Sequence, residues 1–244
     1  MTLMRAPGHH PCKPRPGHEV LKETTEPRLP GSPLEVTAIE EDVMGELVVN
    51  MFTSLDGVLQ GPGAPDEDRA GGFAYGGWQA PYLDEESGKV ITDHIAGMEA
   101  LLLGRKTYEI FAAYWPQQPA ENPIAARLNG APKYVASRTL DTVGWTNSKL
   151  IQGDVAEAVA RVKGEFGRVD VIGSGNLVQT LLRNDLVDRL NLWVYPVLLG
   201  SGKRLFAEGT VPTALRLVES ATSSKGAVHL TYERAGKPTF GSMA

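Results

Sequence analysis

Leu-Leu-Leu-Gly-Arg-Lys-Thr-Tyr-Glu, residues 101–109, is the stretch that decides the fold of this chain. An apolar run ends at Gly104 and a helical pattern begins at Thr107, so the stretch predicts a buried strand that turns directly into a helix. Arg105 and Lys106 project from the turn as cations, and Thr107 can cap the helix or bond a phosphate oxygen. A capped helix beside a solvated basic pair is the alternative interpretation.

A second unit of the same kind follows at residues 169–186, where the strand ends in Gly173-Ser174-Gly175-Asn176. A glycine turn that opens a helix offers backbone N–H groups to an anion such as a pyrophosphate. The dinucleotide fingerprint is not met, because a third glycine and the later acidic residue are missing, and no Gly-Lys-Ser/Thr completes a P-loop. Ligands of open α/β sheets bind at the carboxyl ends of strands, so two such turns together predict a phosphate-binding edge.

The rest of the chain predicts an α/β fold with a mostly parallel sheet. Strands at 190–197, 215–220 and 228–233 follow one another without helices, which is typical of an antiparallel edge on such a sheet. The other predicted strands are 47–52, 100–103, 133–137 and 169–172, and the predicted helices are 82–97, 107–114, 124–128, 155–166 and 177–186.

Composition and charge exclude several classes of protein. The 244 residues are 42% hydrophobic with a net charge of −5 and no basic stripe, which argues against a nucleic-acid partner. Cys12 is the single cysteine, so an intrachain disulfide and a cysteine zinc cluster are excluded. No apolar run is long enough for a membrane span or a secretory signal, so we expect a cytoplasmic protein.

The composition divides the chain into three parts. Residues 1–44 are rich in proline and predict a disordered tail, with Met44 as a candidate alternative start. Three histidines in this tail (His9, His10 and His18) are better explained by solvation than by a metal site. Residues 45–235 form the predicted domain and 236–244 a flexible C-terminal tail. The glycine- and proline-rich stretch 57–77 is too long for a simple connection and predicts a functional loop.

The first turn resembles the dihydrofolate reductase motif of an apolar strand, Gly-Arg-x-Thr and an aromatic residue. The resemblance implies a three-layer dihydrofolate-reductase-like fold in which Arg105 grips the 2′-phosphate of NADPH and Thr107 reaches its pyrophosphate. The turn 172–176 resembles the second pyrophosphate turn of that family. Residues 134–139, with Ser137 and Arg138, lie where the family places its adenosine-phosphate site.

Two further motifs are more similar to the C-terminal reductase domain of the bifunctional riboflavin biosynthesis deaminase/reductase and its stand-alone relatives. Thr53-Ser54-Leu55-Asp56-Gly57 resembles their Ser-Leu-Asp-Gly loop, and residues 195–206 resemble their Pro-x-Leu-Leu-Gly-x-Gly…Leu-Phe segment. Val58 stands where riboflavin-pathway reductases often have lysine. Residues 71–78 are typical of neither parent family and are similar to the small stand-alone relatives.

The resemblance implies an NADPH-dependent reductase of a small heterocyclic substrate, of the type that reduces 5-amino-6-(5-phosphoribosylamino)uracil. A dihydrofolate, pteridine or xenobiotic reductase and a non-catalytic NADPH-binding protein are the alternatives. Ser54 and Asp56 are the catalytic candidates, although Asp56 is at least as well explained as a loop cap. Trp78, Tyr82 and Asp84 are the substrate-binding candidates, with Asp84 equally explained by the first turn of a helix. The cofactor-binding candidates are Thr53, Gly104, Arg105, Lys106, Thr107, Ser137, Arg138, Gly173, Ser174, Gly175 and Asn176.

No metal is implied, and the expected partner is a small-molecule substrate. The apolar strand near residues 190–199, with Trp193 and Tyr195, is compatible with a homodimer interface, and core burial explains it equally well.

Overall fold

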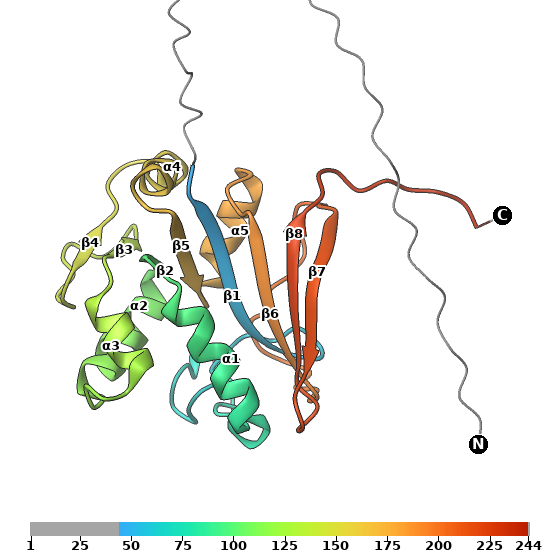
Figure 1. Cartoon of the computed structure of the whole chain (residues 1–244), viewed down its shortest axis with the longest axis horizontal. Helices are drawn as coiled ribbons and strands as arrows, with labels where there is room; N and C mark the ends of the chain where they lie inside the picture. The colour runs from blue at the N-terminus through green and yellow to red at the C-terminus, as the bar shows by residue number, and fades with distance from the viewer. Residues whose placement is uncertain (1–43, 244) are drawn as a thin grey trace, which may run out of the picture. The chain divides into compact units, whose positions relative to one another are not determined.

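Eight strands form one sheet in the computed structural model, which describes residues 44–243 (Figure 1). The order is β4-β3-β2-β5-β1-β6-β8-β7. The expected tail falls outside the described residues except for Met44, as do its three histidines. The strands are β1 (Glu46–Ser54), β2 (Ala100–Gly104), β3 (Lys133–Ala136), β4 (Ser148–Leu150), β5 (Arg168–Ile172), β6 (Arg189–Tyr195), β7 (Leu215–Thr222) and β8 (Val228–Arg234).

Parallel pairing dominates the sheet. β1 lies at its centre and pairs in parallel with β5 and β6, while β2 pairs in parallel with β5 and β3. β8 runs antiparallel to both β6 and β7, so the expected antiparallel C-terminal strands are confirmed. The short edge strand β4, parallel to β3, is an element that the sequence pattern does not predict.

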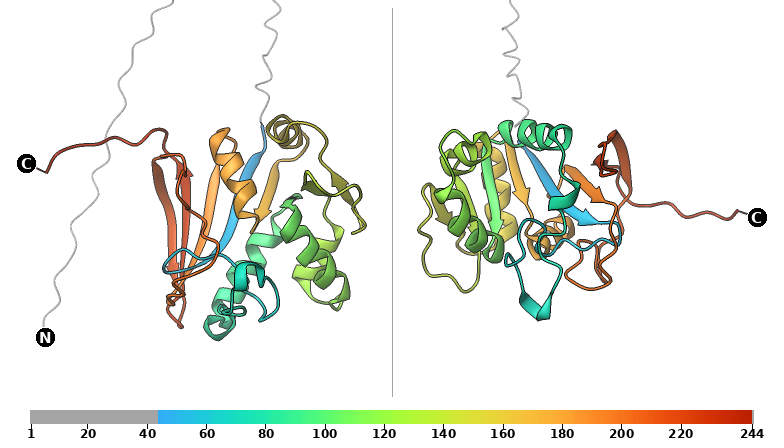
Figure 2. Two further views of the ribbon diagram at one scale, coloured as in Figure 1. Left: turned by 180° about the vertical axis from the view of Figure 1, so that it is seen from behind. Right: turned by 90° about the horizontal axis from the view of Figure 1, so that it is seen from below.

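Helices cover both faces of the sheet (Figure 2). Alternate residues of β2 show why: Leu101 and Leu103 pack with the residues of α1, α2 and α3, while Ala100 and Leu102 pack with those of α4 and α5. A strand buried on both faces needs no polar alternation, which accounts for its continuous apolar run. The three-layer α/β prediction is confirmed. The helices are α1 (Glu85–Ala96), α2 (Arg105–Tyr114), α3 (Pro123–Gly130), α4 (Val155–Glu165) and α5 (Gly175–Arg183), with short 3₁₀ turns η1 (Ala70–Gly72), η2 (Ala80–Tyr82) and η3 (Trp115–Gln117).

A row of polar side chains crosses the sheet beneath α1, on the neighbouring strands β5, β1, β6 and β8. Asn50 Nδ2 donates to Asp170 Oδ1 at 2.7 Å, and Asn191 Nδ2 donates to Asn50 Oδ1 at 3.0 Å. Thr231 Oγ1 donates to Asn191 Oδ1 at 3.0 Å. Arg168 reaches both carboxylate oxygens of Asp170 at 2.8 and 2.9 Å. Buried polar groups are tolerated only when they are paired, and these satisfy one another.

His94 of α1 lies over this row, where its Nδ1 is 3.0 Å from Asn191 Nδ2 and its ring is 4.9 Å from that of His229. Burial lowers the pKa of His94 to about 4, and the nearby His229 and Arg168 act in the same direction, while Glu219 opposes them. Because Asn191 Nδ2 is a donor, it requires an unprotonated Nδ1 on His94.

We predict from this pKa that stability falls as the pH drops from about 6.5 towards 4, because only the unfolded chain takes up a proton on His94 in that range. His94→Gln keeps an acceptor for Asn191 and cannot titrate. Urea unfolding at pH 7.5 and pH 5 should therefore show a smaller loss of unfolding free energy for the variant than for the wild type. Equal losses in the two proteins would rule out His94 as the source. His229, whose pKa is also lowered by burial, contributes to the pH dependence of stability in both proteins.

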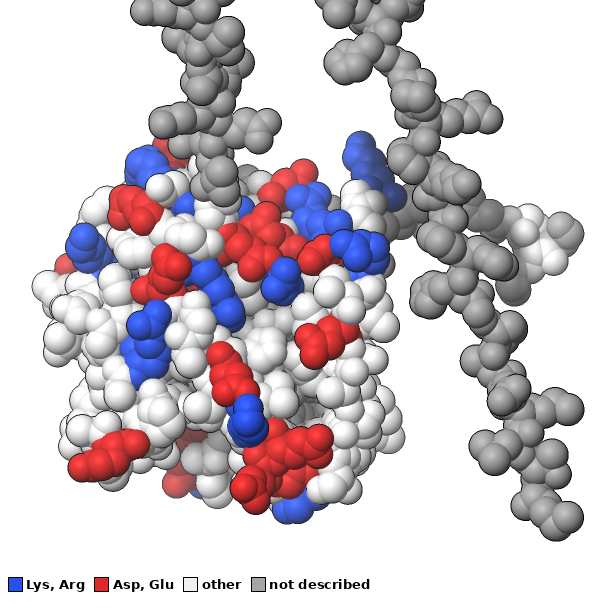
Figure 3. Space-filling view, viewed as in Figure 1, with Lys and Arg blue, Asp and Glu red and all other residues white. Residues whose placement is uncertain are grey.

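Charged side chains of both signs are interspersed on the face shown in Figure 3. Among the described residues, no helix is long and apolar enough to cross a membrane. The same part of the chain holds no cluster of three or more histidine, cysteine or acidic residues suited to a metal ion.

Candidate active site

The two glycine turns, residues 104–107 and 173–176, lie side by side because β2 and β5 are neighbouring parallel strands. Ser174 N–H donates to Thr107 Oγ1 at 3.0 Å, and Gly104 N–H donates to Ser174 Oγ at 3.0 Å. A Cβ on Gly173 would lie 3.3 Å from Thr107 Oγ1, so glycine allows this close approach. The structure thus brings together the two turns that the sequence singles out.

Not every N–H group of the second turn is free, in contrast to the expectation for an anion site. Gly173 N–H bonds the carbonyl of Asn50 at 3.3 Å and Ser174 N–H bonds Thr107, as described above. The N–H groups of Gly175 and Asn176 begin α5 and are the ones that a helix N-terminus leaves for a ligand. The hydroxyl of Thr107 accepts one hydrogen bond and keeps its own proton to donate.

Ser174 has a left-handed backbone (φ 60°), an unusual conformation for a residue other than glycine. Its side chain compensates by accepting the N–H of Gly104. We predict that Ser174→Ala lowers the unfolding free energy by about 1–2 kcal/mol, because the backbone cost remains and the acceptor is lost. Ser174→Gly removes the backbone cost and should be more stable than the alanine variant by roughly 1 kcal/mol. Urea unfolding of both variants checks this order, and an alanine variant as stable as the glycine variant would contradict it.

Arg105 begins α2 at the exposed end of the first turn. Its Nη1 donates to Thr139 Oγ1 at 2.9 Å, and its Nε lies 3.7 Å from Glu109 Oε1. Ser137 Oγ accepts the N–H groups of Thr139 and Leu140 and so shapes the turn after β3. Arg138 in that turn is exposed, as is Lys106. The side chain of Arg105 therefore joins the turn after β2 to the turn after β3.

The loop after β1 is held by Ser54 and Asp56. Ser54 Oγ donates to Asp56 Oδ1 at 2.6 Å, and the N–H groups of Leu199 and Gly200 donate to the same carboxylate at 3.2 and 2.9 Å. Arg204 forms an ion pair with it at 3.2 Å. The hydrogen bond from Ser54 is the largest cause of a pKa well below the ordinary value for Asp56. These contacts favour the loop-cap interpretation of Asp56 over a catalytic one, because they keep the carboxylate ionised and already use its oxygens as hydrogen-bond acceptors.

Thr53, which precedes Ser54 in the chain, is buried on β1. None of its side-chain atoms forms a hydrogen bond with the described part of the chain, so its expected contact with a cofactor stays a prediction.

Aromatic rings gather beside the end of β1. Tyr195 at the end of β6 is fully buried, and its ring centre lies 5.7 Å from Trp78, 6.3 Å from Tyr82 and 6.5 Å from Phe52. Gln79 Nε2 donates to the Tyr195 hydroxyl at 2.7 Å. Tyr195 thus organises the cluster that contains two of the substrate-binding candidates.

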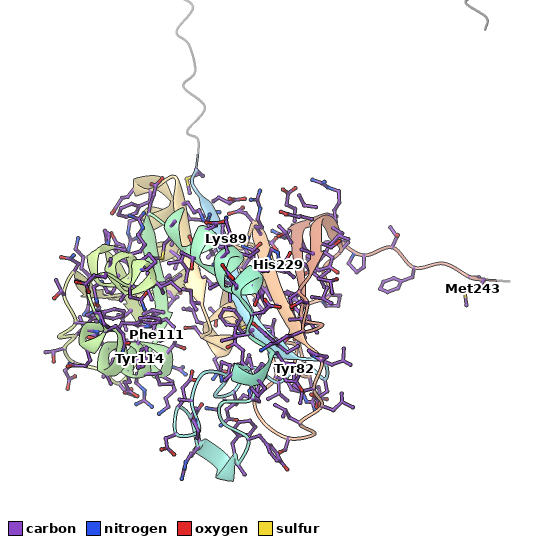
Figure 4. The ribbon with its side chains drawn as sticks, turned by 60° about the horizontal axis from the view of Figure 1, so that its bottom comes forward. Tyr82, Lys89, Phe111, Tyr114, His229 and Met243 are labelled. Atoms are coloured by element: carbon purple, nitrogen blue, oxygen red, sulfur yellow. The ribbon has the colours of Figure 1, made fainter. Side chains whose placement is uncertain are left out.

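Tyr82 is half-buried at the lower end of α1 in Figure 4, whereas Phe111 and Tyr114 lie apart from it on α2. Its position leaves part of the ring open to a ligand.

Asp84 is occupied as a helix cap. Its Oδ1 accepts the N–H of Ser87 at 2.8 Å and the hydroxyl of Ser87 at 2.6 Å, and its Oδ2 accepts the Ser224 hydroxyl at 2.8 Å. The Ser87 hydrogen bonds are the largest cause of a pKa well below the ordinary value of this carboxyl. The contacts favour the interpretation of Asp84 as part of the first turn of α1 over a substrate contact.

A hollow of about 330 Å³ opens between the glycine-rich loop (residues 57–77) and the segment after β6. Gln60 on one wall accepts the backbone N–H of Lys203 on the other wall. Sequence patterns give no signal for this contact, because the two residues are 143 positions apart in the chain. The hollow is lined by Gln60, Ala70, Gly71, Gly72, Phe73, Ser201, Gly202 and Lys203.

Comparisons with known proteins place this chain in a family. Residues 46–229 match the model of the family described as the RibD C-terminal domain. Two uncharacterized proteins of Bacillus subtilis (strain 168) are similar in sequence. YyaP is 26% identical over 194 residues, covering 78% of this chain and 95% of YyaP. YwjB is 31% identical over 159 residues, covering 63% and 86%.

Solved structures share the fold at low sequence identity. A protein named for riboflavin biosynthesis from Shewanella sp. PV-4 has a TM-score of 0.60 and 22% identity, with 78% of this chain and 98% of that chain covered. The diaminohydroxyphosphoribosylaminopyrimidine deaminase/5-amino-6-(5-phosphoribosylamino)uracil reductase of Thermotoga maritima has a TM-score of 0.54 and 14% identity, with 79% and 57% covered. These two likenesses concern the fold alone and agree with the expected dihydrofolate-reductase-like architecture.

Proposed function

Because this chain belongs to the RibD C-terminal domain family, we propose that it is an NADPH-dependent reductase of a small heterocyclic substrate. The observation that carries the proposal is the contact between the two glycine turns, with Arg105 at their exposed end. NADPH would supply the hydride from its nicotinamide ring. The proposed substrate is of the riboflavin-pathway type, similar to 5-amino-6-(5-phosphoribosylamino)uracil.

The residues present fit a dinucleotide that carries an extra phosphate. The absence of a side chain on Gly173 lets the two turns approach each other, and α5 begins there with its N–H groups. The Thr107 hydroxyl and the N–H groups of Gly175 and Asn176 would bind the pyrophosphate. Arg105, helped by Lys106 or Arg138, would bind the 2′-phosphate, since a guanidinium matches a phosphate with paired hydrogen bonds.

The substrate side of the site is aromatic. Trp78 is fixed by a hydrogen bond from its Nε1 to the carbonyl of Gln60 at 2.8 Å, so its ring holds a defined position in the aromatic cluster. The half-buried ring of Tyr82 is placed to contact a flat heterocycle. Asp56 and Asp84 are both held ionised by hydrogen bonds, so we assign neither the role of proton donor.

A substrate panel tests the proposal. NADPH oxidation should be measured with the aminouracil intermediate of riboflavin synthesis, dihydrofolate and simple quinones. Turnover of the aminouracil compound supports the proposal, whereas turnover of dihydrofolate or of quinones alone supports a pteridine or xenobiotic reductase. Tight NADPH binding without any turnover would indicate a non-catalytic binding protein. Failure to bind NADPH would contradict all of these functions.

We also propose a homodimer, with Leu198 as the candidate contact within the segment 190–199. Trp193 and Tyr195 are buried within the single chain, so core packing accounts for them. Leu198, which follows the same strand, is 70% exposed and is available for contact with a second copy. The wild type should sediment as a dimer and Leu198→Glu as a monomer. A variant that stays dimeric would contradict an interface at Leu198.

A further inference from the structure

The hydroxyl of Tyr108 holds the segment that connects β3 to β4, residues 137–147, which we call the β3–β4 connection. Tyr108 is 6% exposed and lies near the start of α2. Its oxygen accepts the backbone N–H groups of Gly144 and Trp145 at 2.9 and 3.0 Å, so both of its acceptor positions are used. A phenylalanine in its place would leave two backbone donors without their acceptor.

Arg105 attaches the beginning of the same connection to α2. It precedes Tyr108 by about one helical turn, so the two side chains leave the same side of the helix. Its Nη1 donates to Thr139 Oγ1 at 2.9 Å, and Ser137 Oγ accepts the N–H of Thr139 at 3.1 Å. The connection is therefore attached to α2 at two points, Thr139 and Gly144.

The residues between the two attachments are packed. Leu140 and Val143 lie against the hydrophobic cluster that contains Tyr108 and Trp145. The Trp145 ring is itself fixed, because its Nε1 donates to Asn129 Oδ1 at 2.8 Å. A packed segment as short as 140–143 transmits a displacement of one attachment to the other, since close-packed side chains have little free space.

Glu109 competes with Thr139 for the guanidinium of Arg105. Its Oε1 lies 3.7 Å from Arg105 Nε, one turn further along α2. While Thr139 holds Nη1, the guanidinium is directed towards the β3–β4 connection. Without that hydrogen bond, the arginine is free to pair fully with the carboxylate four residues away on the same helix. A phosphate would then have to displace the carboxylate before it could bind.

We propose that Tyr108 is a positioning residue that gives the site its preference for a 2′-phosphorylated nucleotide. It fixes the β3–β4 connection, so that Thr139 orients Arg105. The proposal rests on the proposed function, because it needs Arg105 to bind the 2′-phosphate. The proposed pyrophosphate contacts are the same for NADPH and NADH, so the loss of the Tyr108 hydroxyl should weaken the binding of NADPH alone.

Fluorescence titration of Tyr108→Phe with both nucleotides tests the proposal. We expect the Kd for NADPH to rise about fivefold and the Kd for NADH to stay within about twofold of the wild type. Tyr134→Phe is the matched control, because Tyr134 is also buried and its hydroxyl donates to Glu165 on the opposite face of the sheet. Both nucleotides should bind this control with wild-type affinity. An equal rise of both Kd values in Tyr108→Phe, or no rise for NADPH, would overturn the proposal.

A double-mutant cycle tests whether Tyr108 acts through Thr139. Thr139→Val removes the acceptor of Arg105 and should also raise the Kd for NADPH about fivefold. The double variant should bind NADPH no more weakly than the weaker of the two single variants, because both changes break one line of contacts. If the two losses multiply, Tyr108 does not act through Thr139 and the proposal is wrong.

Amide hydrogen exchange measured by NMR reports the attachment without any nucleotide. The N–H groups of Gly144 and Trp145 should exchange about tenfold faster in Tyr108→Phe, and unchanged exchange would show that Tyr108 does not hold the connection. If the wild type prefers NADPH and Tyr108→Phe keeps that preference, only the positioning role fails. If the wild type does not bind NADPH, the positioning role and the proposed function fail together.

Discussion

Arg105→Ala should weaken NADPH binding by roughly ten- to a hundredfold and leave NADH binding within about twofold of the wild type. The expected loss reflects about 1.5–3 kcal/mol for hydrogen bonds to a charged group. Arg105 is the proposed partner of the 2′-phosphate, the group that distinguishes the two nucleotides. In the structure its guanidinium is held towards the turn after β3 by Thr139 and lies near Glu109, so it is already oriented at the edge. Fluorescence titration with both nucleotides measures the two affinities.

Arg161→Ala is the matched control for this experiment. Arg161 is an exposed arginine of α4, on the opposite face of the sheet from α2, and its removal changes the net charge by the same amount. Both nucleotides should bind this variant with wild-type affinity. Equal losses of NADPH and NADH affinity in Arg105→Ala would show that Arg105 acts on a part common to both nucleotides and would contradict the 2′-phosphate assignment.

Asp170→Ala should lower the free energy of unfolding by about 3–5 kcal/mol. Asp170 is 1% exposed and receives two hydrogen bonds from Arg168 and one from Asn50. Its removal leaves the Arg168 guanidinium with only the carbonyl of His94 as an acceptor, and it leaves Asn50 Nδ2 without its acceptor inside the sheet. Burial raises the pKa of Asp170 and the two partners oppose this effect, so the carboxylate depends on them for its charge.

Urea unfolding measures the loss, with Asp93→Ala as the control. Asp93 forms an exposed ion pair with Lys89 one helical turn away on α1, and pairs of this kind contribute about 0.5 kcal/mol or less. A loss below about 1 kcal/mol for Asp170→Ala would mean that the polar row rearranges or admits water when the carboxylate is removed.

The features predictable from sequence are local ones. The two glycine turns can be identified because each joins an apolar run to a helical pattern within a few residues, and both periodicities are visible in the sequence. β4 is missed because its three residues, Ser148 to Leu150, carry no apolar run, and the middle one is exposed. Asp84 is ambiguous in the sequence because an acidic residue before a helix fits a cap and a ligand contact equally well, and only the contacts with Ser87 and Ser224 separate them.

The remaining features depend on contacts between distant parts of the chain. Asp56 and Gly200 are separated by 144 positions, and Asp68 and Lys203 by 135. No period or spacing in the sequence signals such a pair, since the strand order alone brings the two loops together. The resemblance to riboflavin-type reductases places both segments in one family pattern, but it does not show that one side chain joins them.

The central position of β1 also has a consequence for synthesis on the ribosome. β1 is the first strand of the described chain, and its neighbours β5 and β6 begin at Arg168 and Arg189. At translation rates of roughly 5–20 residues per second, the apolar run 47–52 waits on the order of ten seconds before either neighbour emerges. Throughout that interval it is an unpaired apolar segment of the kind that molecular chaperones bind. The middle of this sheet is therefore completed late, after most of the polypeptide has left the exit tunnel.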